Sequence, residues 1–159
     1  MNIKKLFSVA AVVTFVGSTF LNGLALAATP DTELGKAYEW AHSKGITTMD
    51  TYEAANMDKP ITRAQMAKML SVYAMSELGM KPDTTKTECN EFNDIANITG
   101  DLHEYIITSC QLGLMGQQIF SGIKEFRPNA NISRAEFGTA LSRTLWGGKY
   151  EGGTPYYAN

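Results

Sequence analysis

A five-residue motif occurs twice in this chain and constrains its fold more than any other feature. Residues 61–65 read Ile-Thr-Arg-Ala-Gln, and residues 132–136 read Ile-Ser-Arg-Ala-Glu. In both copies a hydroxyl residue precedes a Gln or Glu by three positions, which is the signature of a capping box at the start of a helix. The isoleucine ahead of each cap stands where a hydrophobic staple packs. The duplication therefore predicts two equivalent helices that begin at Arg63 and Arg134.

Apolar residues follow both motifs at helical spacing, and we expect these two stripes to face a core. Glycines at positions 79 and 147 stand where each helix should stop. The stripe after the first motif consists of Met66, Ala67, Leu70, Tyr73, Ala74 and Leu78, and the stripe after the second consists of Phe137, Ala140, Leu141 and Leu145.

A shorter helix is predicted upstream of each motif. Residues 33–44 and 101–112 carry apolar residues on one face, and Gly45 and Gly113 end them. Each unit is therefore expected to run helix, glycine stop, long loop, motif, helix. No segment after the N-terminal region alternates long enough to indicate a strand. The predicted fold class is mainly α, with helix-loop-helix units that form a helical bundle with long loops.

The N-terminal region indicates export. Lys4 and Lys5 precede an uncharged stretch that runs to Pro30, and Ala25-Leu26-Ala27 forms an A-x-A cleavage site. We interpret residues 1–27 as a signal peptide cleaved near Ala27, the alternative being an uncleaved membrane anchor. In both cases the remaining chain lies outside the cytoplasm.

The charge balance excludes several classes of function. The chain has 14 Lys+Arg and 16 Asp+Glu, a net charge of −2. Removal of the signal peptide takes away two lysines and no acid, so the exported chain is more acidic still. This composition excludes a nucleic-acid binder steered by bulk positive charge, and the export signal excludes a cytosolic enzyme. A single apolar segment also excludes a polytopic membrane protein.

Two cysteines, Cys89 and Cys110, remain after cleavage. In an exported protein an even pair favours one disulfide, which here would close a loop of about 20 residues and contribute about 3 kcal/mol. The alternative is two unrelated buried thiols. Nothing in the spacing alone decides between them.

The second half of the chain resembles a known family. Phe92-x-Asp94, a helix ending in Leu112-Gly113, Gly122-x-x-x-Phe126-x-Pro128 and the motif at residues 132–136 follow one another in the order of an S-layer homology (SLH) repeat. The first half resembles the same repeat with fewer elements, since it lacks the F-x-D and G-x-F-x-P parts. The resemblance divides the chain into a first SLH-like repeat at 28–80, a second at 88–148, and a linker with the possible start of a third at 149–159.

The resemblance implies a non-catalytic module that anchors an exported protein to the cell envelope of a bacterium. SLH repeats are typically arranged in threes as a pseudo-trimer and bind a secondary cell-wall polysaccharide or another peptidoglycan-linked polymer, often an acidic one. No cofactor, metal or nucleic acid is implied. The alternative function is structural: the units would pack against other copies in a surface layer, without a glycan site.

Arg63 and Arg134 are the candidate contacts with an acidic polymer. Each opens a helix, where free backbone N–H groups and the positive end of the helix dipole favour an anion. A guanidinium adds a planar fork that matches a carboxylate. The alternative is that each arginine pairs with a nearby acid and stabilises its unit. The residues expected to shape these helix starts are Thr62, Gln65, Ser133 and Glu136, and those expected to support the motif are Phe92, Asp94, Gly122, Phe126 and Pro128.

Catalytic and metal-binding patterns are weak in the sequence. His103-Glu104 begins like a zinc-protease motif, but Ile107 occupies the position of the required second histidine. Asp94 and Asp101 lie in a glycine-containing loop without the alternating acidic order of a calcium-binding loop. For Asp94 we expect a role in a turn or cap. The sequence therefore predicts a binding protein and not an enzyme.

Overall fold

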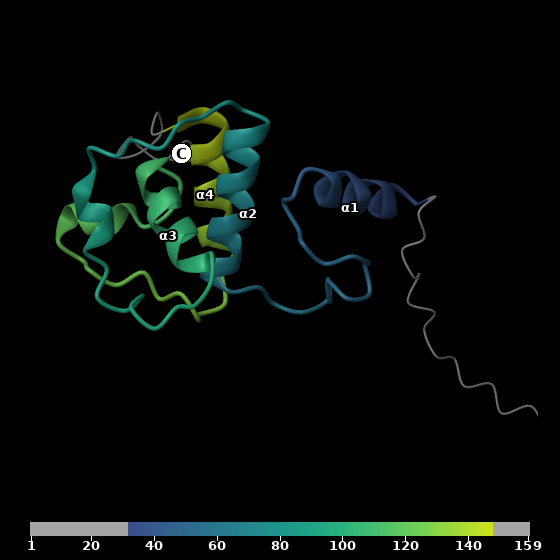
Figure 1. Cartoon of the computed structure of the whole chain (residues 1–159), viewed down its shortest axis with the longest axis horizontal. Helices are drawn as coiled ribbons and strands as arrows, with labels where there is room; N and C mark the ends of the chain where they lie inside the picture. Colours follow the sequence, from purple (N-terminus) through teal and green to yellow (C-terminus); the bar gives the residue numbers. More distant parts are fainter. Residues whose placement is uncertain (1–31, 148–159) are drawn as a thin grey trace, which may run out of the picture.

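The computed structural model describes residues 32–147, and in this range the protein is mainly helical (Figure 1). Four α-helices occur there, together with the short 3₁₀ helices η1 and η2, and no strand longer than a single bridge is formed. The predicted signal peptide and the predicted start of a third unit lie outside the described residues. The elements are α1 (Glu33–Ser43), α2 (Arg63–Ser76), η1 (Thr87–Asn90), α3 (Leu102–Gln111), η2 (Gln117–Ser121) and α4 (Arg134–Trp146).

All four helices start and end within one or two residues of the predicted positions. Both predicted capping boxes are present, so α2 begins directly after Thr62 and α4 directly after Ser133. The Thr62 hydroxyl accepts from the Gln65 amide at 3.2 Å, and the Gln65 side chain accepts from the Thr62 amide at 2.8 Å. Within the described residues, no helix is long and apolar enough to span a bilayer.

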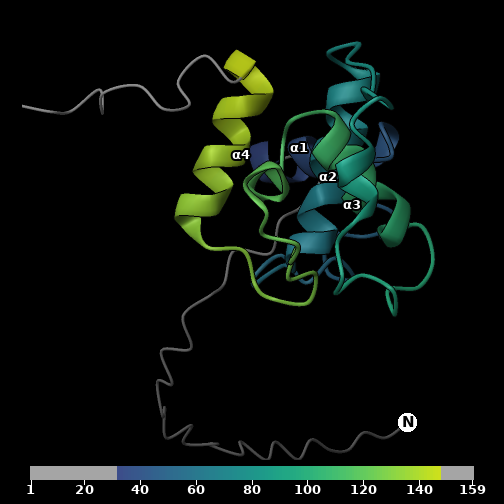
Figure 2. The same ribbon diagram turned by 90° about the vertical axis from the view of Figure 1, so that its left-hand side faces the viewer.

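The core forms where α2 and α3 pack against each other (Figure 2). Helix α2 contributes mostly small side chains to this interface, among them Ala67 and Ala74, which are completely buried. Helix α3 contributes Ile106, also completely buried. At the margin, Lys68 Nζ lies 2.6 Å from Asp101 Oδ2 and joins the two helices on the surface. Small side chains on α2 allow the two helices to approach closely.

A disulfide connects Cys89 of η1 to Cys110 of α3, which confirms the predicted pairing. Both residues are completely buried in the core cluster. The bond therefore holds the loop that follows α2 against the helix that covers α2. A cross-link of this length is expected to add about 3 kcal/mol to the free energy of unfolding.

The predicted core stripe of α4 is confirmed at Ala140 and wrong at Phe137 and Leu145. Phe137 is 40% exposed and Leu145 is 52% exposed, while the buried residues of the helix are Ala140 and Thr144. Helix α4 therefore turns a different face inward from the one that its apolar spacing indicates. In the first stripe only Leu78 departs in the same way, because it follows the end of α2 and is exposed.

The two motif segments lie antiparallel to each other, which the sequence did not indicate. A bridge pairs Thr62 with Asn131, and the Ile132 amide donates to the Ile61 carbonyl at 3.0 Å. The Arg63 amide donates in turn to the Ala130 carbonyl at 2.9 Å. This pairing brings the N-termini of α2 and α4 side by side.

Helix α1 lies to one side of the other helices, joined to them by the long loop before α2 (Figure 1). The Trp40 ring meets the Tyr73 ring of α2 edge to face, with 6.3 Å between their centroids, and Lys44 pairs with Glu77 at 3.1 Å. Tyr38 is buried against its own loop, where its hydroxyl donates to the Thr51 carbonyl.

Candidate functional site

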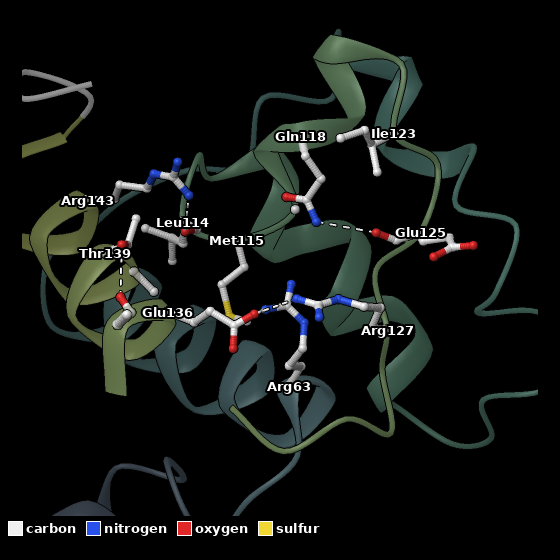
Figure 3. A pocket seen from close by; sticks show the side chains of 13 residues that line it. Arg63, Leu114, Met115, Gln118, Ile123, Glu125, Arg127, Glu136, Thr139 and Arg143 are labelled. Carbon is white, nitrogen blue, oxygen red and sulfur yellow. Dashed lines mark hydrogen bonds and ion pairs between the residues drawn. The ribbon is translucent and has the colours of Figure 1, made fainter. Parts of the chain in front are cut away.

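A groove of about 450 Å³ opens between α4 and the loop that follows α3 (Figure 3). One wall comes from α4 and the other from the segment around η2, while the N-terminus of α2 closes one end. Apolar side chains and charged groups alternate around it. The residues that line the groove are Arg63, Leu114, Met115, Gly116, Gln118, Ile123, Glu125, Arg127, Ala135, Glu136, Thr139, Ala140 and Arg143.

Arg63 is the most deeply placed charge in the groove, with only 5% of its surface exposed. Its Nε donates to the Phe126 carbonyl at 2.7 Å, and its Nη1 donates to Glu136 Oε1 at 2.7 Å. The guanidinium also lies over the Phe126 ring, 5.1 Å from the centroid. Burial lowers the pKa of Arg63 from its ordinary value, and the negative charge of Glu136 opposes that shift. The guanidinium stays charged because its ordinary pKa is far above neutral.

Glu136 is the centre of the charged network. Its Oε1 accepts from both Arg63 and Arg127, while its Oε2 accepts from the Ser133 amide and hydroxyl at 2.9 Å each. The hydrogen bond from the Ser133 backbone is the largest cause of a lowered Glu136 pKa, and the Ser133 hydroxyl and the two guanidinium charges lower it further. One carboxylate thus caps α4 and neutralises two arginines.

Arg127 reaches the same carboxylate from the loop side. Its Nη2 lies 2.5 Å from Glu136 Oε1, and 55% of its side chain is exposed. The Asp94 carboxylate accepts from the Phe126 amide at 2.9 Å and from the Arg127 amide at 2.6 Å. Asp94 therefore fixes the loop that carries Arg127. The sequence predicts a turn or cap role for Asp94 close to Phe92, whereas its carboxylate accepts from amides 32 and 33 residues further along the chain.

Arg143 stands at the opposite end of the groove from Arg63 (Figure 3). Its Nη1 lies 3.4 Å from the Leu114 carbonyl. Three guanidinium groups thus line the groove against the carboxylates of Glu125 and Glu136. The groove therefore carries an excess of positive charge in a chain whose net charge is negative.

The structure separates the two arginines that sequence reasoning treated as equivalent. Arg63 lines the groove, whereas Arg134 is exposed at the start of α4 and lies outside it. Thr62 and Ser133 cap their helices, as expected, and Glu136 enters the groove while Gln65 stays exposed outside it.

The motif-supporting residues lie behind the groove. The Phe92 and Phe126 rings pack edge to face at 5.4 Å, and both residues are buried. A side chain at Gly116 would come within 2.7 Å of the Phe92 ring, so this position requires glycine. The Pro128 carbonyl accepts from the Ala64 amide at 3.1 Å, and Gly122 follows η2. These residues form the packing that holds the loop wall in place.

Sequence reasoning missed Arg127 and Arg143. Arg127 occupies the variable position between Phe126 and Pro128, where the motif specifies no residue type. Arg143 lies about two helical turns beyond the motif, and its side chain reaches the Leu114 carbonyl of the loop. A helical wheel places residues 136, 139, 140 and 143 on one face of α4, and this was the available signal.

Residues 91–137 match the family model described as the S-layer homology domain. No curated protein and no solved structure matched the chain. The matched segment holds Asp94, Arg127 and Glu136, whereas Arg63 comes to the groove from α2, outside the match. S-layer homology domains are generally cell-surface anchoring modules without catalytic activity. The chain therefore contains a segment, residues 91–137, that matches the S-layer homology domain.

Proposed function

We propose that this protein is exported and attaches to a bacterial cell envelope by binding an acidic polysaccharide linked to the cell wall. The observation that carries the proposal is the arginine-rich groove between α4 and the loop before it. The family supplies the general role of surface anchoring. The groove supplies a place where an acidic polymer can be recognised.

The chemistry of the groove suits a charged sugar. Guanidinium groups bind carboxylates and phosphates through planar, charge-assisted hydrogen bonds. Beside them, Ile123 is 55% exposed and presents apolar surface against which the C–H face of a sugar ring can pack. Because the chain as a whole is acidic, recognition would depend on these placed donors and not on long-range attraction.

The proposed organisation of the chain follows the same reasoning. Residues 1–27 would direct export, 28–80 and 88–148 would form two SLH-like units, and 149–159 would lead into a third in a pseudo-threefold arrangement. The antiparallel pairing of the two motif segments supports treating them as corresponding parts of two units. Anchoring of this kind requires binding and no chemical step, so we do not propose an enzyme.

Co-sedimentation with cell walls tests the proposal. The purified protein is mixed with walls of the source bacterium, before and after acid treatment that strips the secondary polymer. We expect sedimentation with intact walls that is lost on stripping. If the folded protein fails to sediment with intact walls, or binds stripped walls equally well, the glycan site is wrong.

Arg134 provides a separate arm of the same experiment. That it contacts the polymer stays a prediction, since it lies outside the groove. Arg134→Ala should fold normally because the side chain is exposed. Loss of sedimentation in this variant would place a second contact at the start of α4, and retained sedimentation would confine binding to the groove.

A second candidate function is structural self-assembly, and the exposed apolar face of α4 favours it. Phe137 and Leu145 lie about 80° apart around the helix axis, on one side of α4, and each is at least 40% exposed. Such surfaces often mark contacts with other chains. Self-assembly predicts concentration-dependent association in sedimentation velocity that Arg134→Ala leaves unchanged and Leu145→Lys abolishes. A strictly monomeric protein at high concentration would remove this candidate.

A further inference from the structure

Arg127 has an unusual backbone conformation. Its φ angle is +60°, and among the described non-glycine residues only Asn56 shares a positive φ. Residues with a side chain rarely adopt this left-handed region because Cβ comes close to the following carbonyl oxygen. A strained arginine at the edge of a groove indicates that its surroundings impose the conformation, and such positions concentrate at functional sites.

Asp94 imposes that conformation. Its two carboxylate oxygens accept from two successive amides, those of Phe126 and Arg127. This arrangement points both N–H groups toward one carboxylate and leaves the Arg127 side chain on the opposite side, where Figure 3 shows it directed into the groove. Asp94 lies more than thirty residues upstream in the chain, so the loop geometry is held by tertiary contact.

The surroundings of Arg127 leave it more accessible to a ligand than Arg63. Arg63 is 5% exposed, with the Phe126 carbonyl, the Phe126 ring and Glu136 around its guanidinium. The Arg127 side chain is 55% exposed. A guanidinium carries five N–H donors, and the contact with Glu136 occupies only part of this capacity. Arg63 thus holds Glu136 in place, and Arg127 faces the open groove.

We infer that Arg127 is the groove's principal contact for the anionic group of its ligand, and that Asp94 is the positioning residue that aims it. This inference rests on the proposed polysaccharide binding and names the side chain that carries it. The ligand group is a planar or tetrahedral oxyanion able to accept two parallel N–H donors. A carboxylate of an acidic sugar and a phosphodiester of a wall polymer share this chemistry.

The sharpest test replaces Arg127 with glycine. Glycine adopts a positive φ without strain, so Arg127→Gly removes the guanidinium without straining the loop backbone. We expect an affinity for intact wall sacculi reduced about tenfold or more, because charge-assisted hydrogen bonds are lost, with only a small change in Tm. Arg127→Lys, which keeps the charge without the fork, should lie between the two.

Lys124→Ala is the matched control. Lys124 is on the same loop, pairs with Glu91 on the surface at 2.7 Å and does not line the groove. This variant removes one positive charge of the same loop, so its affinity should stay within about twofold of the original protein, as expected for a screened surface charge.

A double-mutant cycle tests the positioning role of Asp94. Asp94→Asn leaves only one acceptor oxygen for the two amides and should weaken binding. In the Arg127→Gly background the same change should have no further effect on affinity, since there is no guanidinium left to aim. A purely structural role for Asp94 would reduce affinity equally in both backgrounds and would overturn this part of the inference.

The outcomes separate the inference from the proposed function. If the original protein does not sediment with intact sacculi, the proposed function fails and the inference falls with it. If the original protein sediments and Arg127→Gly sediments equally well, polysaccharide binding stands and the role of Arg127 is overturned. Competition with polygalacturonate or with poly(glycerol phosphate) identifies the anion as carboxylate or phosphodiester, and competition by neither polymer would contradict an anionic ligand group.

Discussion

Helices α2 and α4 begin with the same motif, yet one is buried and the other is largely exposed. Corresponding positions on the two helices carry similar residue types. On α2 all of these positions are buried, whereas on α4 none is. The corresponding pairs are Arg63 and Arg134, Met66 and Phe137, Ala67 and Gly138, Leu70 and Leu141, Ser71 and Ser142, and Ala74 and Leu145.

This difference in burial shows that the motif specifies where a helix starts and not what packs against the helix. Both capping boxes form with the same geometry because they need only residues within one turn. Burial of α2 comes from α3, which packs along it and is tied to η1 by the disulfide. Within residues 32–147 no element covers the corresponding face of α4.

A second difference lies inside the motif itself. Gln65 and Glu136 both cap their helices, but only Glu136 carries a charge. As a carboxylate it can also pair with Arg63 and Arg127, so the second copy becomes the centre of a network and the first supplies one of its cations. The two arginines therefore gather at the second copy of the motif, because the carboxylate of Glu136 can accept from both and carries a negative charge.

We expect the largest difference in the free energy of unfolding between variants of the two motif arginines. Arg63→Ala should lower the free energy of unfolding by about 3 kcal/mol, because it removes a buried partner of a carboxylate and leaves a cavity beside Phe126. Arg134→Ala should change it by less than about 0.5 kcal/mol, since the side chain is exposed. Urea unfolding of both variants measures this, and equal costs would contradict the contrast between the helices.

Adding the same side chain to both helices should give effects of opposite sign. Ala67 is completely buried, so Ala67→Leu should cost about 2 kcal/mol through overpacking against α3. A side chain at Gly138 meets nothing within 4 Å, so Gly138→Leu should stabilise α4 by up to about 1 kcal/mol through helix propensity. Thermal unfolding followed by circular dichroism compares them. Destabilisation of both would mean that α4 is covered in solution.

Replacing the charged capping residue should alter the response to acid. Glu136→Gln should cost about 1–2 kcal/mol at pH 7, because the amide cannot satisfy two guanidinium groups. The folded-state pKa of Glu136 is lowered, so its contribution is present above its unfolded pKa of about 4.3 and disappears as the pH falls through the lower folded value. The variant should therefore lose less stability than the original protein between pH 7 and pH 3.

Glu104→Gln is the control for this pH experiment. Glu104 is an exposed carboxylate on α3 that lies outside the groove network. Urea midpoints of this variant should follow the pH dependence of the original protein. If Glu136→Gln and Glu104→Gln show the same pH dependence, the network around Glu136 contributes nothing specific to acid stability.

We expect the smallest changes in stability from alanine substitutions at two corresponding serines. Ser71 is completely buried on α2 and its hydroxyl has no hydrogen-bond partner, so Ser71→Ala should raise stability by about 1 kcal/mol. Ser142 on α4 is half-buried, and Ser142→Ala should change stability by no more than a few tenths of a kcal/mol, within helix propensity. A destabilised Ser71→Ala would reveal a partner for that hydroxyl.

Local features of the fold could be predicted from the sequence, and long-range ones could not. The helix starts at Arg63 and Arg134, the helix ends near Gly45 and Gly113 and the mainly α class all depend on neighbouring residues. The disulfide could be favoured by counting cysteines and is formed. The inward face of α4 could not be predicted, because apolar spacing shows which face is apolar and not which element meets it.

Only part of the candidate site could be predicted from the sequence, because the rest depends on long-range contacts. Arg63 and Glu136 stood out because the motif repeats, but nothing local indicated that the arginine of one copy would pair with the glutamate of the other. Arg127 was hidden because its role depends on Asp94, far upstream, and on a strained backbone that sequence patterns do not reveal. Sites that depend on pairing between distant segments require the structure.

The pairing of the two motif segments also sets the order in which the chain can fold. Arg63 finds its carboxylate 73 residues further along, and its backbone amide finds Ala130 only when that segment is present. A chain that is synthesised N-terminus first would thus expose the start of α2 until residue 136 has been added. Closure of so long a loop is entropically costly and slow to achieve. The start of α2 therefore cannot complete its native contacts until the segment that contains Ala130 and Glu136 is present.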